Sequence, residues 1–361
     1  MKTLEINCSK NYDILIGSGL LAKAGALIAQ RIDPCRVCIV TDEIVGSLYG
    51  GPDSPLWQGL QDAGFDVYEF TFPAGERNKR LATVESILSL LAEHNFDRKD
   101  ALIALGGGVP GDITGFAAAI YMRGIRFVQI PTTLLACVDS SIGGKTGVDL
   151  REGKNLAGAF WQPELVIEDT DVFDTLTDDL YRDGFAEIVK AGMIGDPSIV
   201  QAFHENDIRE TNKEALTEII VKALRVKSDI VAKDERESGL RQLLNLGHTI
   251  GHAIEKCSDY HISHGSAVAT GCVIASAAAA SKGWTDVTNA QLLQDIFVKH
   301  GFVLDPFADA KALAAAAGND KKSHGDSVTI IYPVNPGACD MRSLPKSELE
   351  AFIQSGLDYM K

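Results

Sequence analysis

Four of the chain's eight histidines lie between His248 and His264. If the segment 241–255 is a single helix, four of its polar side chains share one face, because residues three and four apart lie above one another. They are Arg241, Asn245, His248 and His252. Two histidines one turn apart can bind a metal or belong to a hydrogen-bonded polar face. A zincin motif is excluded, because Thr249 stands where His-Glu-x-x-His requires glutamate.

Glu187 is a candidate third ligand. It lies on a predicted helix, 183–190, with Lys190 one turn later. One glutamate with His248 and His264 gives three protein ligands and an open position, which is how proteins hold a catalytic zinc ion. The alternative is a surface ion pair of small effect between Glu187 and Lys190. The sequence therefore offers a one-Glu, two-His metal site as a hypothesis.

A glycine-rich segment indicates a second kind of site. The sequence Gly-Gly-Gly-Val-Pro-Gly at 106–111 follows a predicted buried strand, 101–105, and opens a predicted helix, 113–120. Its backbone N–H groups and the helix N-terminus could approach a pyrophosphate. Asp42, at the end of an earlier strand, could accept hydrogen bonds from a ribose. No acidic residue follows about twenty positions after the glycines, as a Rossmann fingerprint requires. The prediction is therefore a dinucleotide site whose residues are arranged along the chain differently from those of a Rossmann domain.

Basic residues gather after the next predicted strand. The tripeptide 144–146 is Gly-Lys-Thr, but Asp139 stands where a P-loop requires its first glycine, so this is not a P-loop. Arg123, Lys145 and Lys154 instead predict an anion pocket in a chain whose net charge is −15. Surface lysines without a shared role are the alternative.

The elements that must position these residues change along the chain. Strands are expected at 12–16, 37–40, 65–72, 101–105 and 127–130, with helices at 20–31 and 79–93. Strands that are apolar on both faces and alternate with helices indicate a parallel sheet, whose ligands gather at the carboxyl ends of the strands. Beyond residue 171 helices dominate, at 183–190, 214–227, 243–256 and 268–280, before a late strand at 328–332. We expect an α/β, NAD-binding domain with a mainly parallel Rossmann-like sheet over 1–177, and a mainly α-helical metal- and substrate-binding domain over 178–361.

Length, charge and cysteine content exclude several classes of protein. A chain of 361 residues is long enough for two medium domains, and a net charge of −15 argues against a nucleic-acid binder. Seven cysteines at irregular spacing do not form a disulfide framework, which points to a reducing compartment. No apolar run is long enough to span a bilayer and the N-terminus has no signal-peptide pattern. We expect a cytoplasmic protein with no membrane partner, and a homodimer as the common default.

These motifs, in this order, resemble the 3-dehydroquinate synthase family of sugar-phosphate cyclases. The matching segments are 106–119, 121–124, 131–136, 138–146, 153–155, 186–190, 234–237, 244–255 and 264–265. The resemblance extends over most of the chain between about residues 40 and 322.

The resemblance implies a role for each matching residue. The metal ligands would be Glu187, His248 and His264. The catalytic residues would be Lys145, Asn155, Arg241, Asn245 and His252. The other substrate-binding residues would be Arg123, Asp139, Lys154, Lys190, Lys227 and either Lys321 or Lys322. NAD would be held by Asp42, Glu76, Lys79, Gly107, Gly108, Val109, Asp112, Thr132, Thr133 and Thr175. His252 would relay protons and not bind the metal, with a hydrogen bond to a neighbouring carboxylate as its alternative role.

The resemblance also implies the reaction, which belongs to the shikimate pathway of chorismate and aromatic amino-acid biosynthesis. The substrate 3-deoxy-D-arabino-heptulosonate 7-phosphate would be oxidised transiently by NAD, lose phosphate, be reduced again and close by an internal aldol step to 3-dehydroquinate. One divalent metal would act as Lewis acid, with zinc as the first choice and cobalt or iron as alternatives.

Three alternatives remain. A related cyclase would use sedoheptulose 7-phosphate or glucose 6-phosphate, a metal-dependent polyol dehydrogenase would release NADH, and a silent homologue would only bind a ligand. Sedoheptulose 7-phosphate and glucose 6-phosphate lack a carboxylate. The presence of Arg241 and Asn245, which match the family motifs, therefore favours the heptulosonate as substrate.

Two segments depart from the family pattern. The family usually has Leu-Pro-x-Arg-Glu ahead of the glutamate ligand, where this chain has Leu-Thr-Asp-Asp-Leu at 176–180, and Ser266 replaces the glutamate of His-Gly-Glu. Neither change removes a predicted ligand. Both alter the surroundings of the metal site, which tune metal affinity and ligand orientation.

Overall fold

The computed structural model describes residues 1–237, 239–318 and 326–361. These residues form two compact units, Met1–Leu176 and Thr177–Lys361, which we call the N-terminal and C-terminal units. The boundary predicted from the sequence lies one residue later, between residues 177 and 178. In the ranges that the structure describes, no helix is long and apolar enough to cross a lipid bilayer. All seven cysteines are free thiols, in agreement with their irregular spacing.

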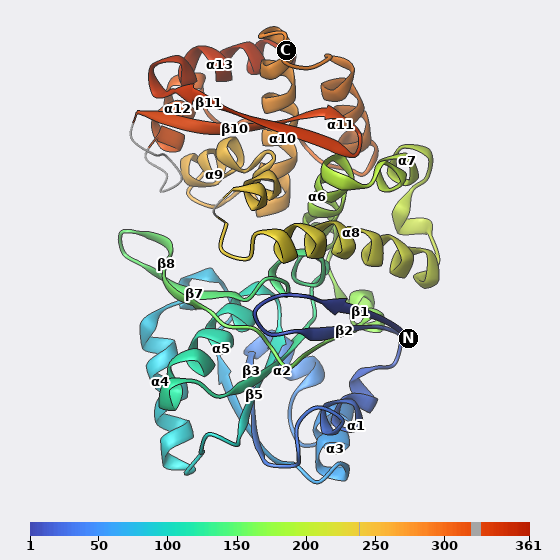
Figure 1. The fold of residues 1–361 in the computed structure, drawn as a ribbon, viewed down its shortest axis with the longest axis vertical. Helices are drawn as coiled ribbons and strands as arrows, with labels where there is room; N and C mark the ends of the chain where they lie inside the picture. Colours follow the sequence, from blue (N-terminus) through green and yellow to red (C-terminus); the bar gives the residue numbers. More distant parts are fainter. Residues whose placement is uncertain (238, 319–325) are drawn as a thin grey trace. The chain divides into compact units, whose positions relative to one another are not determined.

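The N-terminal unit is built on a seven-stranded sheet (Figure 1). Its strand order is β1-β2-β9-β6-β5-β3-β4, and every neighbouring pair is parallel except β1 with β2. The strands are β1 (Lys2–Ile6), β2 (Tyr12–Gly17), β3 (Arg36–Asp42), β4 (Asp66–Phe72), β5 (Ala101–Gly106), β6 (Arg126–Pro131) and β9 (Leu165–Asp169). The predicted mainly parallel sheet is therefore confirmed.

Helices join the strands of this sheet. They are α1 (Ala24–Ala29), α2 (Glu43–Tyr49), α3 (Pro55–Asp62), α4 (Leu81–Glu93) and α5 (Gly108–Ile120). Helix α5 buries Ile113, Ala117 and Ala118 in one core cluster with Leu102 and Phe127 of the sheet. Its small alanine side chains allow the helix to lie close to the strands. The helix expected over 20–31 is shorter, because a 3₁₀ turn occupies Leu21–Lys23 before α1 begins.

Several elements of this unit were not expected from the sequence. The small-residue stretch after β6 forms a π-helical turn, Ala136–Ser140, and then the antiparallel hairpin β7 (Lys145–Leu150) and β8 (Gly153–Phe160). Strand β7 contacts α5, and the tip of the hairpin protrudes (Figure 1). A 3₁₀ segment, Thr170–Thr175, ends the unit.

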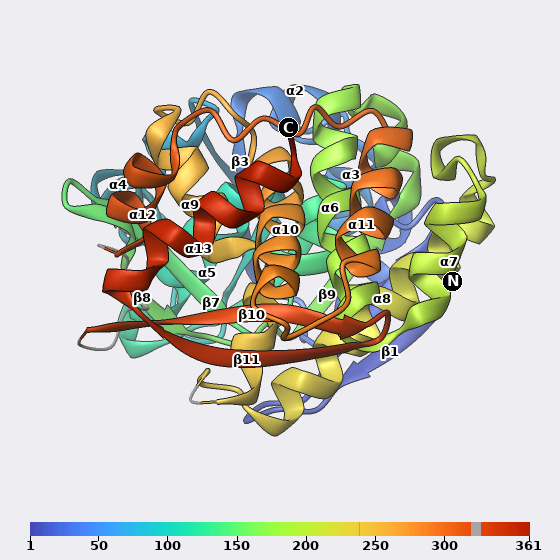
Figure 2. The same ribbon diagram turned by 90° about the horizontal axis from the view of Figure 1, so that it is seen from above.

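The C-terminal unit is mainly helical, as the sequence predicts. Its helices are α6 (Asp178–Gly195), α7 (Pro197–Glu205), α8 (Lys213–Lys233), α9 (His248–Cys257), α10 (His264–Ser281), α11 (Thr288–Lys299), α12 (Ala310–Gly318) and α13 (Lys346–Tyr359). A single antiparallel pair, β10 (Ser327–Asn335) with β11 (Ala338–Pro345), completes the described part. Helix α10 contacts α6, α9, α11 and α13, and Figure 2 shows it between α13 and α11. Its alanine-rich sequence has no polar face, as suits a helix buried on all sides.

Helix α6 begins within the segment that departs from the family pattern. The Thr177 hydroxyl caps it by accepting a hydrogen bond of 3.4 Å from the N–H of Leu180. Asp178 and Asp179 occupy the first turn, where negative charge complements the helix dipole. The departure therefore keeps a competent helix start ahead of Glu187.

The prediction of one continuous helix over the histidine segment is wrong. A 3₁₀ segment, Leu240–Asn245, is followed by a turn at Gly247, and α9 begins only at His248. Gly247 has a φ of +76°, and a Cβ on it would lie 2.4 Å from the Cys272 sulfur. Only glycine combines this conformation with so close an approach to α10. Arg241 and Asn245 therefore do not share a helical face with the histidines.

Candidate functional site

Three residues from three helices converge in the C-terminal unit. Glu187 lies in the middle of α6, while His248 and His264 are the first residues of α9 and α10. Oε1 of Glu187 lies 3.3 Å from Nε2 of His264 and 3.5 Å from Nε2 of His248. All three ligand atoms lie within 4.8 Å of one another, a spacing that can hold a metal ion. The structure thus brings together the three residues for which the family motifs imply a metal site.

Glycines set the two histidines side by side. A Cβ on Gly271 of α10 would lie 2.2 Å from the carbonyl oxygen of Gly247, and one on Gly251 of α9 would lie 3.1 Å from that of Ala267. The two helix backbones are therefore nearly in contact. As a result the rings of His248 and His264 have their centroids 5.4 Å apart.

Hydrogen bonds orient both imidazoles. Nδ1 of His248 lies 3.1 Å from the carbonyl oxygen of Leu246, and because a carbonyl only accepts, Nδ1 is the donor. Nε2 is then the ring nitrogen on the side of Glu187, where it could bind a metal. Nδ1 of His264 lies 3.5 Å from Oε2 of Glu255. A carboxylate or carbonyl behind each histidine is the usual arrangement around a protein-bound metal.

The charges around Glu187 suit a cation. Its other oxygen, Oε2, forms an ion pair with Lys190. Burial lowers the pKa of His264, but hydrogen bonds to Glu187 and Glu255 outweigh this effect and raise that pKa to about 10. The buried carboxylates of Glu187 and Glu255 lie on either side of His264. Their negative charge would stabilise a divalent cation, so the donor set fits a metal ion.

The same region offers a second set of ligands. His252, Glu255 and His264 also place ligand atoms within 4.8 Å of one another. The rings of His252 and His264 are 6.2 Å apart, against 5.4 Å for His248 and His264. His264 belongs to both sets, so the role of His252 as a relay and not a ligand stays a prediction.

The substrate-binding residues predicted in this unit include three buried cationic side chains. Lys190, Lys227 and Arg241 are buried, and Arg241 donates its backbone N–H to Oδ2 of Asp234 at 3.0 Å. Its guanidinium also donates to the Glu235 carbonyl. Burying three cations is costly unless anions compensate, which suits a region that binds a carboxylate or a phosphate. Lys321 and Lys322 lie outside the described residues.

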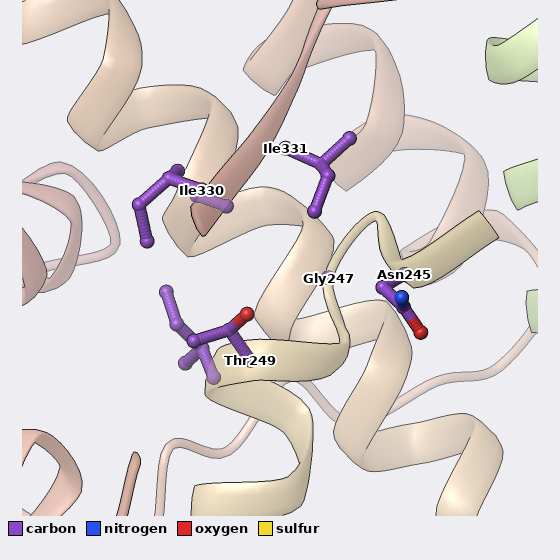
Figure 3. A pocket seen from close by; sticks show the side chains of 7 residues that line it. Asn245, Gly247, Thr249, Ile330 and Ile331 are labelled. Carbon is purple, nitrogen blue, oxygen red and sulfur yellow. The ribbon is translucent and has the colours of Figure 1, made fainter. Parts of the chain in front are cut away.

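Asn245 lies at a small cavity. Its Nδ2 donates a hydrogen bond of 2.8 Å to Oε1 of Glu237. Figure 3 shows Asn245 and Gly247 on the turn that leads into α9, with Ile330 and Ile331 of β10 on another side of the cavity. The Asn245 amide is therefore held by a carboxylate that the sequence analysis gave no role.

Three acidic residues of this region were missed as functional residues. Glu237 and Glu255 fall inside motifs that carry the family resemblance, but nothing in their spacing shows which side chain they contact. Asp183 gives no sequence signal beyond being an acid four residues before Glu187. Their partners, Asn245, His264 and the start of α10, become visible only in the folded chain.

In the N-terminal unit, the predicted NAD-binding residues lie at one edge of the sheet. Strands β3, β5 and β6 are parallel neighbours, so Asp42, Gly107 and Thr132 at or after their carboxyl ends lie along the same edge. Gly107 precedes the first residue of α5, and the N-terminus of this 13-residue helix favours negative charge. Oγ1 of Thr132 is buried and has no hydrogen-bond partner among the described residues. A donor set of this kind fits a dinucleotide with a pyrophosphate and hydroxyl groups.

Other residues predicted to bind NAD also have structural roles. Oδ1 of Asp42 caps α2 by accepting hydrogen bonds from the N–H groups of Ile44 (2.9 Å) and Val45 (3.0 Å). The hydroxyls of Thr175 and Tyr49 lie 2.8 Å apart, which ties the end of the unit to the same helix. The hydroxyl of Thr133 accepts a hydrogen bond from the backbone N–H of Ala136. Val109 packs against the edge of the hydrophobic core.

A buried lysine contacts both a residue predicted to bind NAD and a residue predicted to bind substrate. Nζ of Lys79 lies 2.6 Å from Oδ2 of Asp112 and donates to Oδ1 of Asn155 at 2.7 Å. Burial raises the pKa of the Asp112 carboxyl, and the Lys79 charge opposes this shift. Lys154 pairs with Glu76 at 3.6 Å. The fold therefore places residues predicted to bind NAD against residues predicted to bind substrate.

The remaining predicted residues of this unit are dispersed. Asp139 lies in the π-helical turn, an irregularity that is common at functional sites. Lys145 is exposed at the start of β7. Arg123 has a φ of +68° and lines an open groove with Arg98 and Lys99. The shared anion pocket predicted for Arg123, Lys145 and Lys154 is not shown by these positions and stays a prediction.

Comparison with known proteins accounts for this combination. A family model described as 3-dehydroquinate synthase N-terminal matches residues 69–183, and one described as 3-dehydroquinate synthase C-terminal matches residues 184–323. The chain belongs to the 3-dehydroquinate synthase family. A curated 3-dehydroquinate synthase from Agrobacterium fabrum is 41% identical over 354 residues, which cover 95% of this chain and 93% of the relative.

Solved structures of related cyclases share the fold of this family member. One is 2-epi-5-epi-valiolone synthase from Streptomyces hygroscopicus subsp. jinggangensis with NAD+ and Zn2+ bound, with a TM-score of 0.87, 25% identity and 99% coverage of both chains. Another is 2-deoxy-scyllo-inosose synthase complexed with carbaglucose-6-phosphate, NAD+ and Co2+. Its TM-score is 0.83 at 25% identity, with 98% of this chain and 100% of that chain covered.

Proposed function

We propose that this member of the 3-dehydroquinate synthase family converts 3-deoxy-D-arabino-heptulosonate 7-phosphate into 3-dehydroquinate and phosphate. The observation that carries the proposal is the convergence of Glu187, His248 and His264 within 4.8 Å, in a chain 41% identical to a curated 3-dehydroquinate synthase. The enzyme would be a carbon–oxygen lyase of the shikimate pathway. The lower identity of 25% to cyclases with other names supports this choice over the rival cyclases.

We propose that Glu187, His248 and His264 hold one divalent metal. The related structures contain Zn2+ or Co2+ together with NAD+, which supports both cofactors here. One carboxylate and two imidazoles suit zinc first, with cobalt or iron as alternatives. When bound, the metal supplies Lewis-acid polarisation of the substrate oxygens at and beside the carbon that is oxidised.

The NAD site would be the sheet edge formed by Asp42, Gly107 and Thr132. The N-terminus of α5 would stabilise the pyrophosphate, and the glycines would allow its oxygens to approach the backbone N–H groups. Asp42 caps α2 through Oδ1, so Oδ2 can accept a ribose hydroxyl. NAD supplies reversible hydride acceptance at C5 of the substrate and is regenerated in each cycle.

The chain's polar residues would bind the substrate and move protons. Lys190, Lys227 and Arg241 would neutralise an anionic substrate, and Asn155 is held in place by Lys79. His252, one turn after His248, would relay protons to the reacting hydroxyl groups. A ketone at C5 acidifies the neighbouring C6–H bond, so phosphate leaves by elimination, with its own oxygen accepting the proton. Reduction at C5, ring opening and an internal aldol step would then close the carbocycle.

A substrate comparison tests this function. The purified protein is supplied with NAD+ and with Zn2+ or Co2+. The heptulosonate, sedoheptulose 7-phosphate or glucose 6-phosphate is then added to separate samples, and phosphate release and NADH absorbance are followed in each. We expect phosphate from the heptulosonate with no net NADH. Phosphate only from sedoheptulose 7-phosphate would favour a rival cyclase, and stoichiometric NADH would favour a polyol dehydrogenase.

The assembly is a separate proposal. A homodimer, which is the commonest closed assembly of soluble proteins, should show twice the chain mass of 38.7 kDa in size-exclusion chromatography with light scattering.

A further inference from the structure

Asp183 connects two of the helices that supply the proposed metal ligands. It lies on α6 one turn before Glu187, and its side chain is buried with an exposed fraction of 8%. Oδ1 accepts a hydrogen bond of 2.6 Å from the hydroxyl of Ser263 and one of 3.0 Å from the backbone N–H of Gly265. Ser263 and Gly265 are the residues on either side of His264. The two hydrogen bonds therefore bracket a predicted metal ligand.

The start of α10 depends on this contact. Ser263 is the N-cap of α10, but its hydroxyl makes no capping hydrogen bond within the helix and donates to Asp183 of α6. Backbone N–H groups in the first turn of a helix have no partner within that helix. Asp183 supplies such a partner to Gly265 from another helix. The predicted ligand His264 thus lies in a helix turn that is held from outside its own helix.

The two backbones also touch at this point. A Cβ on Gly265 would lie 2.3 Å from the Cα atom of Asp183, so any other residue would push α10 away from α6. Ser266, which replaces the glutamate of the family pattern, places its hydroxyl 3.0 Å from that of Ser263. Both features keep the first turn of α10 against α6.

We infer that Asp183 is a positioning residue of the metal centre, which locks the first turn of α10 to α6 and so sets the separation of His264 and Glu187. The inference rests on the proposed metal site and adds a residue that is not itself a ligand. Asp183 and Glu187 are one turn apart on α6, and the two hydrogen-bond partners of Asp183 adjoin His264. Few residues therefore separate the two ligands from the contact that holds them. The 3.3 Å approach of Glu187 Oε1 to His264 Nε2 follows from this arrangement.

Asp196 provides a matched control. It caps α7 in the same unit by accepting hydrogen bonds from the backbone N–H (3.0 Å) and the hydroxyl (2.7 Å) of Ser198. Like Asp183, it therefore anchors a helix start through one backbone and one serine donor. It is not among the residues that place a ligand atom in either candidate metal set.

The test compares Asp183→Ala, Asp183→Asn and Asp196→Ala in the full-length protein. Zn2+ affinity is measured by chelator competition, the ligand geometry by the visible absorption of the Co2+-loaded protein, and stability by thermal unfolding. We expect Asp183→Ala to weaken Zn2+ binding by about 10- to 100-fold and to alter the cobalt spectrum, as removal of a residue that orients a ligand does. Asp183→Asn, which keeps an acceptor oxygen, should stay close to wild type. Asp196→Ala should lower thermal stability with unchanged affinity and spectrum.

Three results would overturn the inference. One is an Asp183→Ala protein with the affinity and cobalt spectrum of Asp196→Ala, and another is an Asp183→Asn protein as impaired as Asp183→Ala. If Asp183→Ala does not fold, Ser263→Ala removes the 2.6 Å hydrogen bond to Asp183 together with the hydroxyl contact to Ser266, and leaves the bond from the Gly265 N–H in place. An unchanged cobalt spectrum in that variant would be the third result. Failure of the wild-type protein to bind metal would instead contradict the proposed function.

Discussion

His264 is the residue at which both candidate ligand sets meet. It belongs to the set with Glu187 and His248 and to the set with His252 and Glu255. Substitution separates them. We expect His264→Ala and His248→Ala to lose bound metal, because each removes a ligand, and His252→Ala to keep it while kcat falls on the order of 10²- to 10⁴-fold through loss of proton transfer.

Metal content of the dialysed proteins, measured by elemental analysis, decides between the sets. Retention of metal by His248→Ala together with its loss from His252→Ala would assign the ion to the second set. His204→Ala, on α7, is a suitable control because His204 belongs to neither set.

Glu168 is a buried acid outside the proposed site. It lies on β9, and burial raises its pKa well above 4.5, with only the polar side chain of Ser141 opposing the shift. The folded protein therefore holds this proton more tightly than the unfolded chain does. The contribution of Glu168 to stability is complete below pH 4.5 and is lost as the pH rises toward the raised pKa.

Glu168→Gln should remove this part of the pH dependence. We expect the free energy of unfolding of the variant to fall less than that of wild type as the pH is raised from 4.5, in denaturant titrations at a series of pH values. Glu5→Gln, at an exposed position on β1, should leave the wild-type slope unchanged. Parallel slopes for wild type and Glu168→Gln would show that Glu168 does not hold a proton in the folded state.

At the scale of elements, the metal site depends on the crossing of α9 and α10. Gly247, Gly251 and Gly271 bring the two backbones close enough for the first residues of both helices to meet at Glu187. Gly271→Ala would place a methyl group 2.2 Å from the Gly247 carbonyl oxygen. We expect a loss of about 1–3 kcal/mol in stability, because the clash is with backbone that cannot rotate away.

Denaturant unfolding measures this loss, and chelator competition should show weaker Zn2+ binding in the same variant. Gly318→Ala, at the end of α12, is the comparison, since a Cβ at Gly318 meets no described atom within 4 Å. Equal stability of Gly271→Ala and wild type would contradict the close crossing.

At the scale of the whole molecule, each unit contains residues suited to one cofactor. The metal set lies wholly within Thr177–Lys361, and the sheet edge with Asp42, Gly107 and Thr132 lies within Met1–Leu176. A ligand that binds only the folded state slows local opening where it binds. We therefore expect Zn2+ to slow hydrogen exchange mainly in α6, α9 and α10, and NAD+ to slow it mainly around 106–112 and 131–133.

Hydrogen exchange followed by mass spectrometry resolves these segments. A sample with Zn2+ and excess EDTA is the control for metal, and one with free adenine tests whether protection around 106–112 needs the pyrophosphate. Protection of the sheet edge by Zn2+ alone, or of α9 and α10 by NAD+ alone, would contradict this division of the cofactors.

The sequence by itself determined the features that are local or carried by ordered motifs. Strands such as 37–40 and 101–105 are apolar on both faces, which already requires a covered, mainly parallel sheet. The glycines after 101–105 mark the start of a helix because few other residues turn so tightly. The order of the family motifs singled out Glu187, His248 and His264, which the structure brings together.

Only the tertiary structure decided features that depend on residues far apart in the chain. The turn at Gly247 lies where the chain passes close to Cys272 of α10, and the start of α10 at His264 is held by Asp183, about eighty residues earlier. Lys79 reaches Asn155 in the same way. Local periodicity contains no record of such contacts, because the free energy that selects them comes from packing and hydrogen bonding between segments that meet only in the folded chain.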